Sequence, residues 1–169
     1  KRNRGVSCEV VAYSFKKATD TPAVHKNYGG HKALLAVLKR SGELPSGAGV
    51  CFGRFKGRYG GKHVLFVNLG ENPSGIDALR LTERLRRLGA VAAQKLEAEK
   101  AASALVLADS FITGSDDEGD LQTLSQALME GLLLAPYKFK KYFSKKDDGA
   151  GLKFSVAVKD AKGMSALKK

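Results

Sequence analysis

Residues 130–142, EGLLLAPYKFKKY, decide the fold, because they close a helical pattern and then place aromatic residues between lysines. Leucines recur on one face of this helical pattern, at Leu121, Leu124, Leu128 and Leu132. A face of this kind packs against an apolar surface, so we expect a helix that covers a sheet or another helix. Gly131 and Ala135 are small enough to let another backbone approach this helix closely.

Strand-like and helical segments alternate along the rest of the chain. Strands are expected at 5–15, 49–56, 62–69, 103–109 and 152–158, and helices at 28–40, after 74–77 and after 115–118. Basic residues with Gly60 and Gly61 join the second and third strands, which predicts a hairpin because glycine adopts the positive φ of tight turns. This order predicts an α/β fold, a three-layer sandwich with a mixed β-sheet covered by helices.

Local signals predict where the helices begin and end. The first helix is expected to stop at Ser41 and Gly42. The segment 74–77 has the pattern of a capping box, in which Ser74 and Asp77 would satisfy free backbone N–H groups, and the segment 115–118, which begins at Ser115, repeats this pattern. In the long helix after 74–77, we expect a buried face of Leu81, Leu85, Leu88, Ala92 and Leu96, and an outer side with Arg80, Arg84 and Arg87.

The composition is that of one globular domain. The chain has 169 residues, of which 43% are hydrophobic and 27% are charged. No apolar run reaches the roughly 20 residues that a membrane-spanning helix needs, so no membrane partner is expected. Cys8 and Cys51 both lie in strand-like segments. We favour two buried free thiols in a cytoplasmic protein, with a disulfide as the alternative.

The sequence shows no motif that carries chemistry. It has no HExxH and no nucleophile motif, so we expect no catalytic residues and no metal ligands in this chain. His25 and His31 flank a glycine turn, where solvated histidines are expected rather than a metal pair. His63 is expected at the rim of a strand. The glycines between 47 and 61 lie within the predicted hairpin, where they suit bends and turns better than a phosphate loop.

The segment 130–142 resembles the end of the amino-terminal domain in the leucyl (cytosol) aminopeptidase family. The residues that carry this signature are Gly131, Tyr137, Phe139 and Tyr142. The segment 29–42, the strand VLFVNLG at 64–70 and the alanine-rich stretch 88–96 resemble other parts of that domain in the same order. The resemblance implies a macro-domain-like fold. It also implies a single domain at 1–160, the start of a linker or tail at 161–169, and a catalytic domain outside this chain.

The family resemblance also implies a function. The parent protein would be a metallopeptidase that removes amino-terminal residues from peptides with two divalent metals, zinc or manganese, held in the absent catalytic domain. That catalytic domain would be the partner of this chain, and the parent would form a homohexamer. This domain would then be non-catalytic and would shape oligomer assembly and access to the active sites.

The formal net charge of +12 leaves a second function class open. Basic residues crowd two segments that also contain aromatics, at Arg54, Lys56, Arg58 and Lys62 and at Lys138, Lys140 and Lys141. Such segments contact phosphates and stack on bases, which would make the chain a nucleic-acid-binding module with weak affinity for DNA or RNA. The alternative that we favour is a core of aromatics with a solvated basic rim.

Overall fold

The computed structural model describes residues 6–15, 22–24, 26–57, 62–71, 76–111, 118–135 and 152–158. Its strands are β1 (Val6–Phe15), β2 (Gly49–Gly53), β3 (His63–Glu71), β4 (Ala101–Leu107) and β5 (Lys153–Ala157). Its α-helices are α1 (Lys32–Arg40), α2 (Ala78–Ala98) and α3 (Glu118–Leu134). Two 3-10 helices, η1 (Lys26–His31) and η3 (Ala108–Phe111), precede α1 and follow β4. Strands and helices thus alternate in the predicted order.

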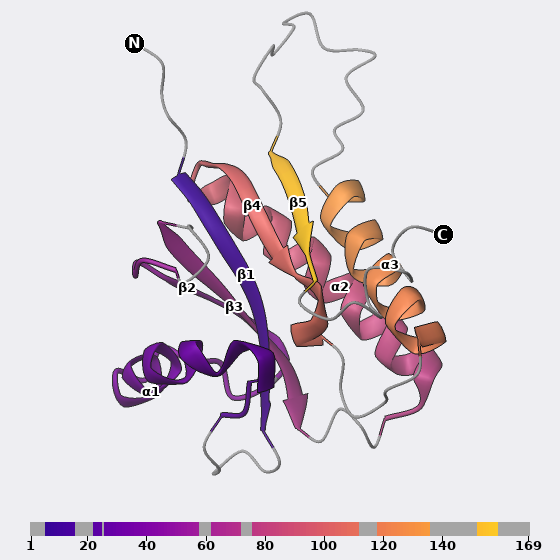
Figure 1. Cartoon of the computed structure of the whole chain (residues 1–169), viewed down its shortest axis with the longest axis horizontal. Helices are drawn as coiled ribbons and strands as arrows, with labels where there is room; N and C mark the ends of the chain where they lie inside the picture. Colours follow the sequence, from indigo (N-terminus) through magenta and orange to yellow (C-terminus); the bar gives the residue numbers. More distant parts are fainter. Residues whose placement is uncertain are drawn as a thin grey trace, which may run out of the picture.

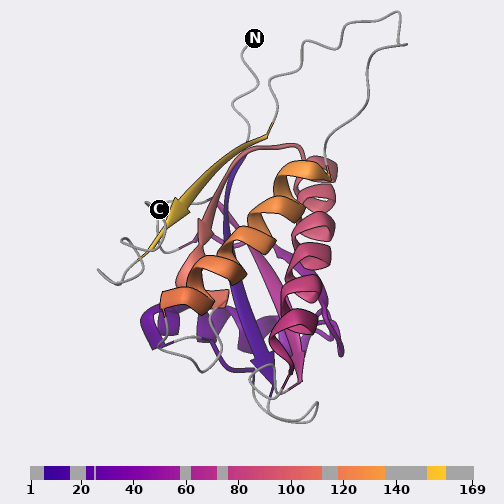
Figure 2. The same cartoon turned by 90° about the vertical axis from the view of Figure 1, so that its right-hand side faces the viewer.

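The five strands form one mixed sheet in the order β2-β3-β1-β4-β5. The β2–β3 pair is antiparallel, as the predicted hairpin requires, and the other three pairs are parallel. Helix α1 covers one face of the sheet, while α2 and α3 lie side by side on the other face (Figures 1 and 2). The three-layer α/β sandwich with a mixed sheet is therefore confirmed.

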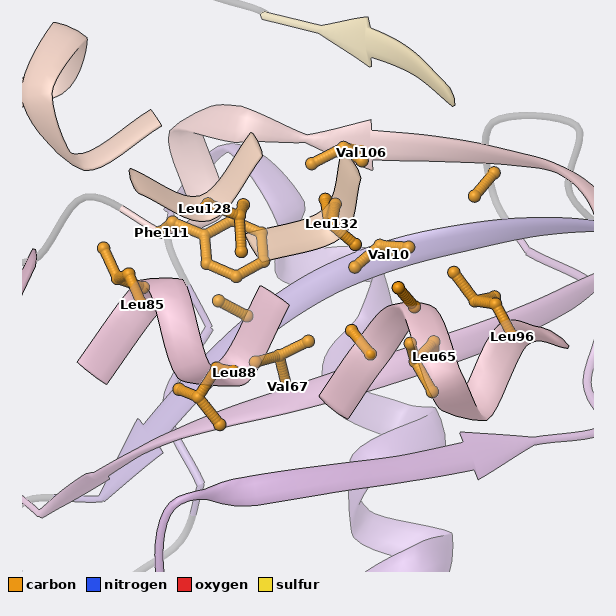
Figure 3. Packing of buried hydrophobic residues seen from close by; sticks show 14 of the residues in the cluster. Val10, Leu65, Val67, Leu85, Leu88, Leu96, Val106, Phe111, Leu128 and Leu132 are labelled. Carbon is orange, nitrogen blue, oxygen red and sulfur yellow. The ribbon is translucent and has the colours of Figure 1, made fainter. Parts of the chain in front are cut away.

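The sheet divides the core into two clusters. One lies between the sheet and α2 and α3, where the buried leucines at 81, 85, 88 and 96 confirm the predicted face of the long helix. Leu128 and Leu132 of α3 lie in the same cluster with Val10, Val106 and Phe111 (Figure 3). The second cluster lies under α1 and contains mainly side chains of β1, β3 and α1. The side chain of Leu121 lies outside the described residues.

The neighbouring helices α2 and α3 come into close backbone contact at a pair of glycines, which we call the crossing. A Cβ atom on Gly131 would overlap the carbonyl group of Arg86 and lie 3.0 Å from the backbone N of Ala90. A Cβ on Gly89 would in turn lie 3.0 Å from the N of Leu132 and 3.2 Å from the Cα of Gly131. The close approach predicted for Gly131 is thus present, and Gly89 is its counterpart in α2.

Several predicted helix boundaries differ from the observed ones. The first helix begins as η1, and α1 proper starts only at Lys32; its end at Ser41 is as predicted, with Gly42 at φ 73°. Helix α2 begins at Ala78 with Asp77 as its N-cap, because the Asp77 carboxylate accepts from the backbone N–H of Arg80. Capping by Asp77 is therefore as predicted, but Asp77 rather than Ser74 is the N-cap residue; Ser74 and Ser115 lie outside the described residues.

One arginine of α2 does not lie where the sequence placed it. Arg80 and Arg87 are exposed, but the half-buried Arg84 turns back toward the sheet. Its guanidinium donates to the carbonyl oxygen of Leu69 at 3.0 Å, beside Gly70 at φ 90°. Arg84 therefore caps the end of β3 rather than sharing the outer face with the other two.

Candidate functional site

The basic hairpin residues lie where β2 ends and β3 begins. Arg54, Lys56 and Lys62 are all exposed. The guanidinium of Arg54, whose side chain is 75% exposed, pairs with the Glu99 carboxylate at 3.0 Å. The ammonium of Lys95 pairs with the other oxygen of the same carboxylate at 3.1 Å. The hydrogen bond from Lys95 and the charge of Arg54 hold the pKa of Glu99 below its usual value.

The other predicted contact residues fall outside the described part of the chain. These are Arg58, Lys138, Lys140 and Lys141, together with the signature aromatics Tyr137, Phe139 and Tyr142. Nucleic-acid contact by either basic segment therefore stays a prediction. The aromatics of the hairpin that are described face the core: Phe52 packs against the cluster under α2 and α3, and Phe55 against the cluster under α1.

A buried pair of titratable side chains lies on the α1 side of the sheet. Glu9 of β1 and His31, the last residue of η1, are both completely buried, and His31 Nε2 lies 3.0 Å from Glu9 Oε2. His31 Nδ1 lies 3.3 Å from the carbonyl oxygen of Tyr28. Nε2 and Oε2 both carry lone pairs, which repel each other unless a hydrogen lies between them. Such a close approach therefore requires a proton between Nε2 and Oε2. The expectation of a solvated His31 is wrong; His25 lies outside the described residues.

Glu9 is not one of the site residues that the sequence predicts. The only signal in the sequence is a carboxylate in the middle of the apolar strand GVSCEVVAYSF, at 5–15. Charged groups are rarely buried unless they are paired, so a charge inside such a strand indicates a partner elsewhere. Nothing in the sequence says that this partner is His31, 22 residues away, because the contact depends on how η1 packs against β1.

Further polar contacts join η1 and the ends of β1 and β4. The Tyr28 hydroxyl donates to the buried Asp109 carboxylate over a long 3.4 Å. Next to it, the Ser110 hydroxyl accepts from the backbone N–H of Ala12 at 2.8 Å and donates to the carbonyl oxygen of Leu107 at 2.6 Å. These bonds fix η3 to the carboxyl end of β1. The two Ser110 bonds satisfy buried backbone groups.

The titratable side chains include two thiols that burial makes unreactive. Cys8 and Cys51 are both buried and free, as predicted. Burial raises the pKa of Cys8 to about 12 and also raises the pKa of Cys51, so neither is a nucleophilic thiolate near neutral pH.

Within the described ranges, no three His, Cys, Asp or Glu side chains gather as a metal site would require. None of the helices described there is long and apolar enough to cross a membrane.

Comparisons with known proteins point to one family. Residues 14–146 match the profile of the cytosol aminopeptidase family, N-terminal domain. A probable cytosol aminopeptidase of Desulfotalea psychrophila is 36% identical over 88 residues, which cover 52% of this chain and 16% of that relative. A mutant of tomato leucine aminopeptidase has a similar fold, with a TM-score of 0.60 at 14% identity, over 99% of this chain and 32% of that chain. This chain thus matches less than a third of the length of either protein.

Proposed function

The chain belongs to the cytosol aminopeptidase family, as its N-terminal domain, and from this we propose that it is the non-catalytic domain of a peptidase that removes amino-terminal residues from peptides. The observation that carries the proposal is the family match over residues 14–146. The two divalent metals, zinc or manganese, would belong to a catalytic domain that is its partner within the same protein. The relative is named a cytosol aminopeptidase, which supports a cytoplasmic location for the whole protein.

A test of this division of labour uses the 169-residue chain alone. We expect no hydrolysis of leucyl-4-nitroanilide by the pure chain in the presence of manganese or zinc. A protein in which this domain is joined to a dimetal catalytic domain should hydrolyse the same substrate. Metal-dependent turnover by the chain alone, lost on chelation, would overturn the proposal.

We further propose that this domain contributes to assembly of a homohexamer and so to access to the active sites. Apolar side chains on the helix layer support this role. Leu133 and Leu134 near the end of α3 are 57% and 67% exposed, and Leu79 near the start of α2 is 77% exposed. Covering such side chains in an oligomer is favourable at about 25 cal/mol per Å² of apolar surface. We place the assembly contact at the end of α3, where two such leucines are adjacent.

The assembly role is tested in the protein that joins this domain to a catalytic domain. Replacing Leu133 and Leu134 by Ser should convert hexamers into smaller species in light scattering, with the domain still folded by circular dichroism. Val37 of α1, 49% exposed on the opposite layer, gives a control as Val37→Ser, which should leave the hexamer intact. Intact hexamers in the leucine variant would refute the assembly contact.

The alternative function is nucleic-acid binding. One observation favours it, the exposure of Arg54, Lys56 and Lys62 at the same end of the hairpin on a chain of net charge +12. Neutralising phosphates with such residues makes affinity depend strongly on salt. If they form a site, replacing all three by Ala should flatten the slope of log affinity against log salt by about 0.9 for each lost contact on duplex DNA.

A control with the same loss of charge separates a site from general attraction. Lys32, Arg40 and Arg80 are exposed and lie away from the hairpin, whereas Arg84 is unsuitable because its guanidinium bonds the end of β3. We expect both triple variants to change the slope equally, which would reject the nucleic-acid function. A much larger effect of the hairpin variant would place that function above the assembly role.

A further inference from the structure

The segment that follows β2 folds back across the sheet on the α1 side. Gly53 pairs with Val64 of β3, and Val64 pairs with Glu9 of β1, so these three residues form one row across the sheet. A Cβ on Gly53 would lie 2.6 Å from the ring of Phe55, so that ring lies directly over Gly53. Phe55 also packs against the core cluster under α1. Residues 54–57, which we call the strap, therefore begin by covering this row.

The strap ends on the buried carboxylate of Glu9. A Cβ on Gly57 would overlap the carboxyl group of Glu9 and lie 2.5 Å from its Oε2. The same Oε2 atom lies 3.0 Å from Nε2 of His31. The Glu9 carboxylate therefore lies between the backbone of Gly57 and the imidazole of His31. Glycine at position 57 leaves room for this carboxylate.

This stacking couples the strap to the buried pair. A carboxylate taken out of water is tolerated only when it is paired, and breaking a buried pair by removing one partner is strongly destabilising. Lifting Gly57 would admit water to the Glu9–His31 pair, and moving the carboxylate would remove the surface on which Gly57 rests. Among the described residues, the ion pair of the strap with a charged group is Arg54 with Glu99, and it lies at the surface, where ion pairs contribute little.

We propose that the Glu9–His31 pair is a latch that holds the strap closed and so fixes where Arg54 and Lys56 stand on the surface. The strap and the pair open together as one local unit, without unfolding of the sheet. Glu9 and His31 act here as positioning residues for the basic end of the hairpin. This assignment is independent of whether those basic side chains bind a partner.

Limited proteolysis tests the latch on the whole chain. Trypsin cleaves after Lys56 only when the strap is open, so the cleavage rate after Lys56 measures opening. We expect Gly57→Ala and Glu9→Ala each to raise this rate at least tenfold. In the double variant the short side chain at position 9 leaves room for the methyl group at position 57, so the rate should stay close to that of the single variants.

Two matched controls isolate the buried contact. Gly47→Ala adds a methyl group that would meet nothing within 4 Å, and Glu99→Gln removes the charge that pairs with Arg54 of the strap and with Lys95 of α2. Both should leave the rate after Lys56 within twofold of the unsubstituted chain. The proposal would be overturned if the increases in cleavage rate caused by the two substitutions multiplied in the double variant. It would also be overturned if Gly57→Ala left the cleavage rate unchanged.

A second measurement keeps the test decisive if Glu9→Ala does not fold. Gly57→Ala alone should shift the nuclear magnetic resonance signal of the His31 ring, because the new methyl group displaces the carboxylate from Nε2. Amide exchange should rise in residues 54–57 but stay unchanged in β1 and β3. A strap that opens while the His31 signal stays fixed, or opening only together with the sheet, would refute the latch.

Discussion

Replacing Gly131 by Ala tests the glycine crossing of α2 and α3 directly. The added Cβ would lie 2.9 Å from the carbonyl carbon of Arg86, closer still to its oxygen, and 3.0 Å from the backbone N of Ala90. Carbon atoms pack best at about 3.5–4.0 Å. The contact with the carbonyl oxygen is the closest, so the two helices would have to separate by roughly 1 Å or more at the crossing. The atoms in the way belong to backbone, so no change of side-chain rotamer relieves the overlap.

Two opposing effects set the size of the change in stability. Alanine is favoured over glycine inside a helix by about 1 kcal/mol. Overpacking a well-packed core costs about 1–3 kcal/mol, and more where backbone must move. The helix separation would also loosen Leu128 and Leu132, which are buried on either side of the crossing. Because the obstacle is backbone, we expect the overpacking to win and the net loss to be about 2 kcal/mol.

Urea unfolding measures this loss as a lower midpoint with an unchanged slope. For a chain of 169 residues, a loss of about 2 kcal/mol also corresponds to a melting temperature about 4–8 °C lower. Gly89→Ala, on the facing helix, should be destabilising for the same reason, whereas Gly47→Ala meets nothing within 4 Å and should not be. A Gly131→Ala variant that is more stable by about 1 kcal/mol would show that helix propensity alone operates and that the helices do not touch here.

Three further predictions follow from single side chains. Leu128→Ala should cost about 2–5 kcal/mol in urea unfolding because the side chain is buried, whereas Leu134→Ala, at an exposed position, should cost almost nothing. Cys8, with its pKa raised to about 12 by burial, should resist iodoacetamide at pH 8 in the folded chain and react after unfolding. The hydrogen bond from Lys95 lowers the pKa of Glu99, so its contribution to stability is complete above the unfolded value of about 4.3 and is lost as the pH falls through the lower folded value. Between pH 5 and 3, the urea midpoint of the Glu99→Gln variant should therefore fall less steeply than that of the unsubstituted chain.

The sequence was sufficient for those parts of the fold that depend on local pattern. The leucine stripe of α3 and the hairpin of β2 and β3 follow from side-chain periodicity and turn chemistry, which neighbouring residues determine. The small residue at Gly131 also signalled a close helix approach. Its counterpart Gly89 was not predicted, because no periodicity says which turn of which helix will face it.

The candidate site depends on contacts between distant segments, and there the sequence was less informative. Each histidine and each arginine looks like a solvated residue when considered alone, which is correct for Arg80 and wrong for His31 and Arg84. Their positions are decided by where η1 and α2 lie on the sheet. The charge within β1 at Glu9 was the available clue, since a buried carboxylate needs a partner.

The central position of β1 has a consequence for folding during synthesis. β1 is made first, but its two neighbours in the sheet, β3 and β4, come much later, and the partner of Val6 in β4 is Ala101. At about 5–20 residues per second, a ribosome needs roughly 5–20 s to reach that partner. An apolar strand that waits this long with free edges is an aggregation hazard, and a charge within it is a known safeguard. Glu9 supplies that charge while the strand waits, and the His31 ring contacts the carboxylate once the sheet closes.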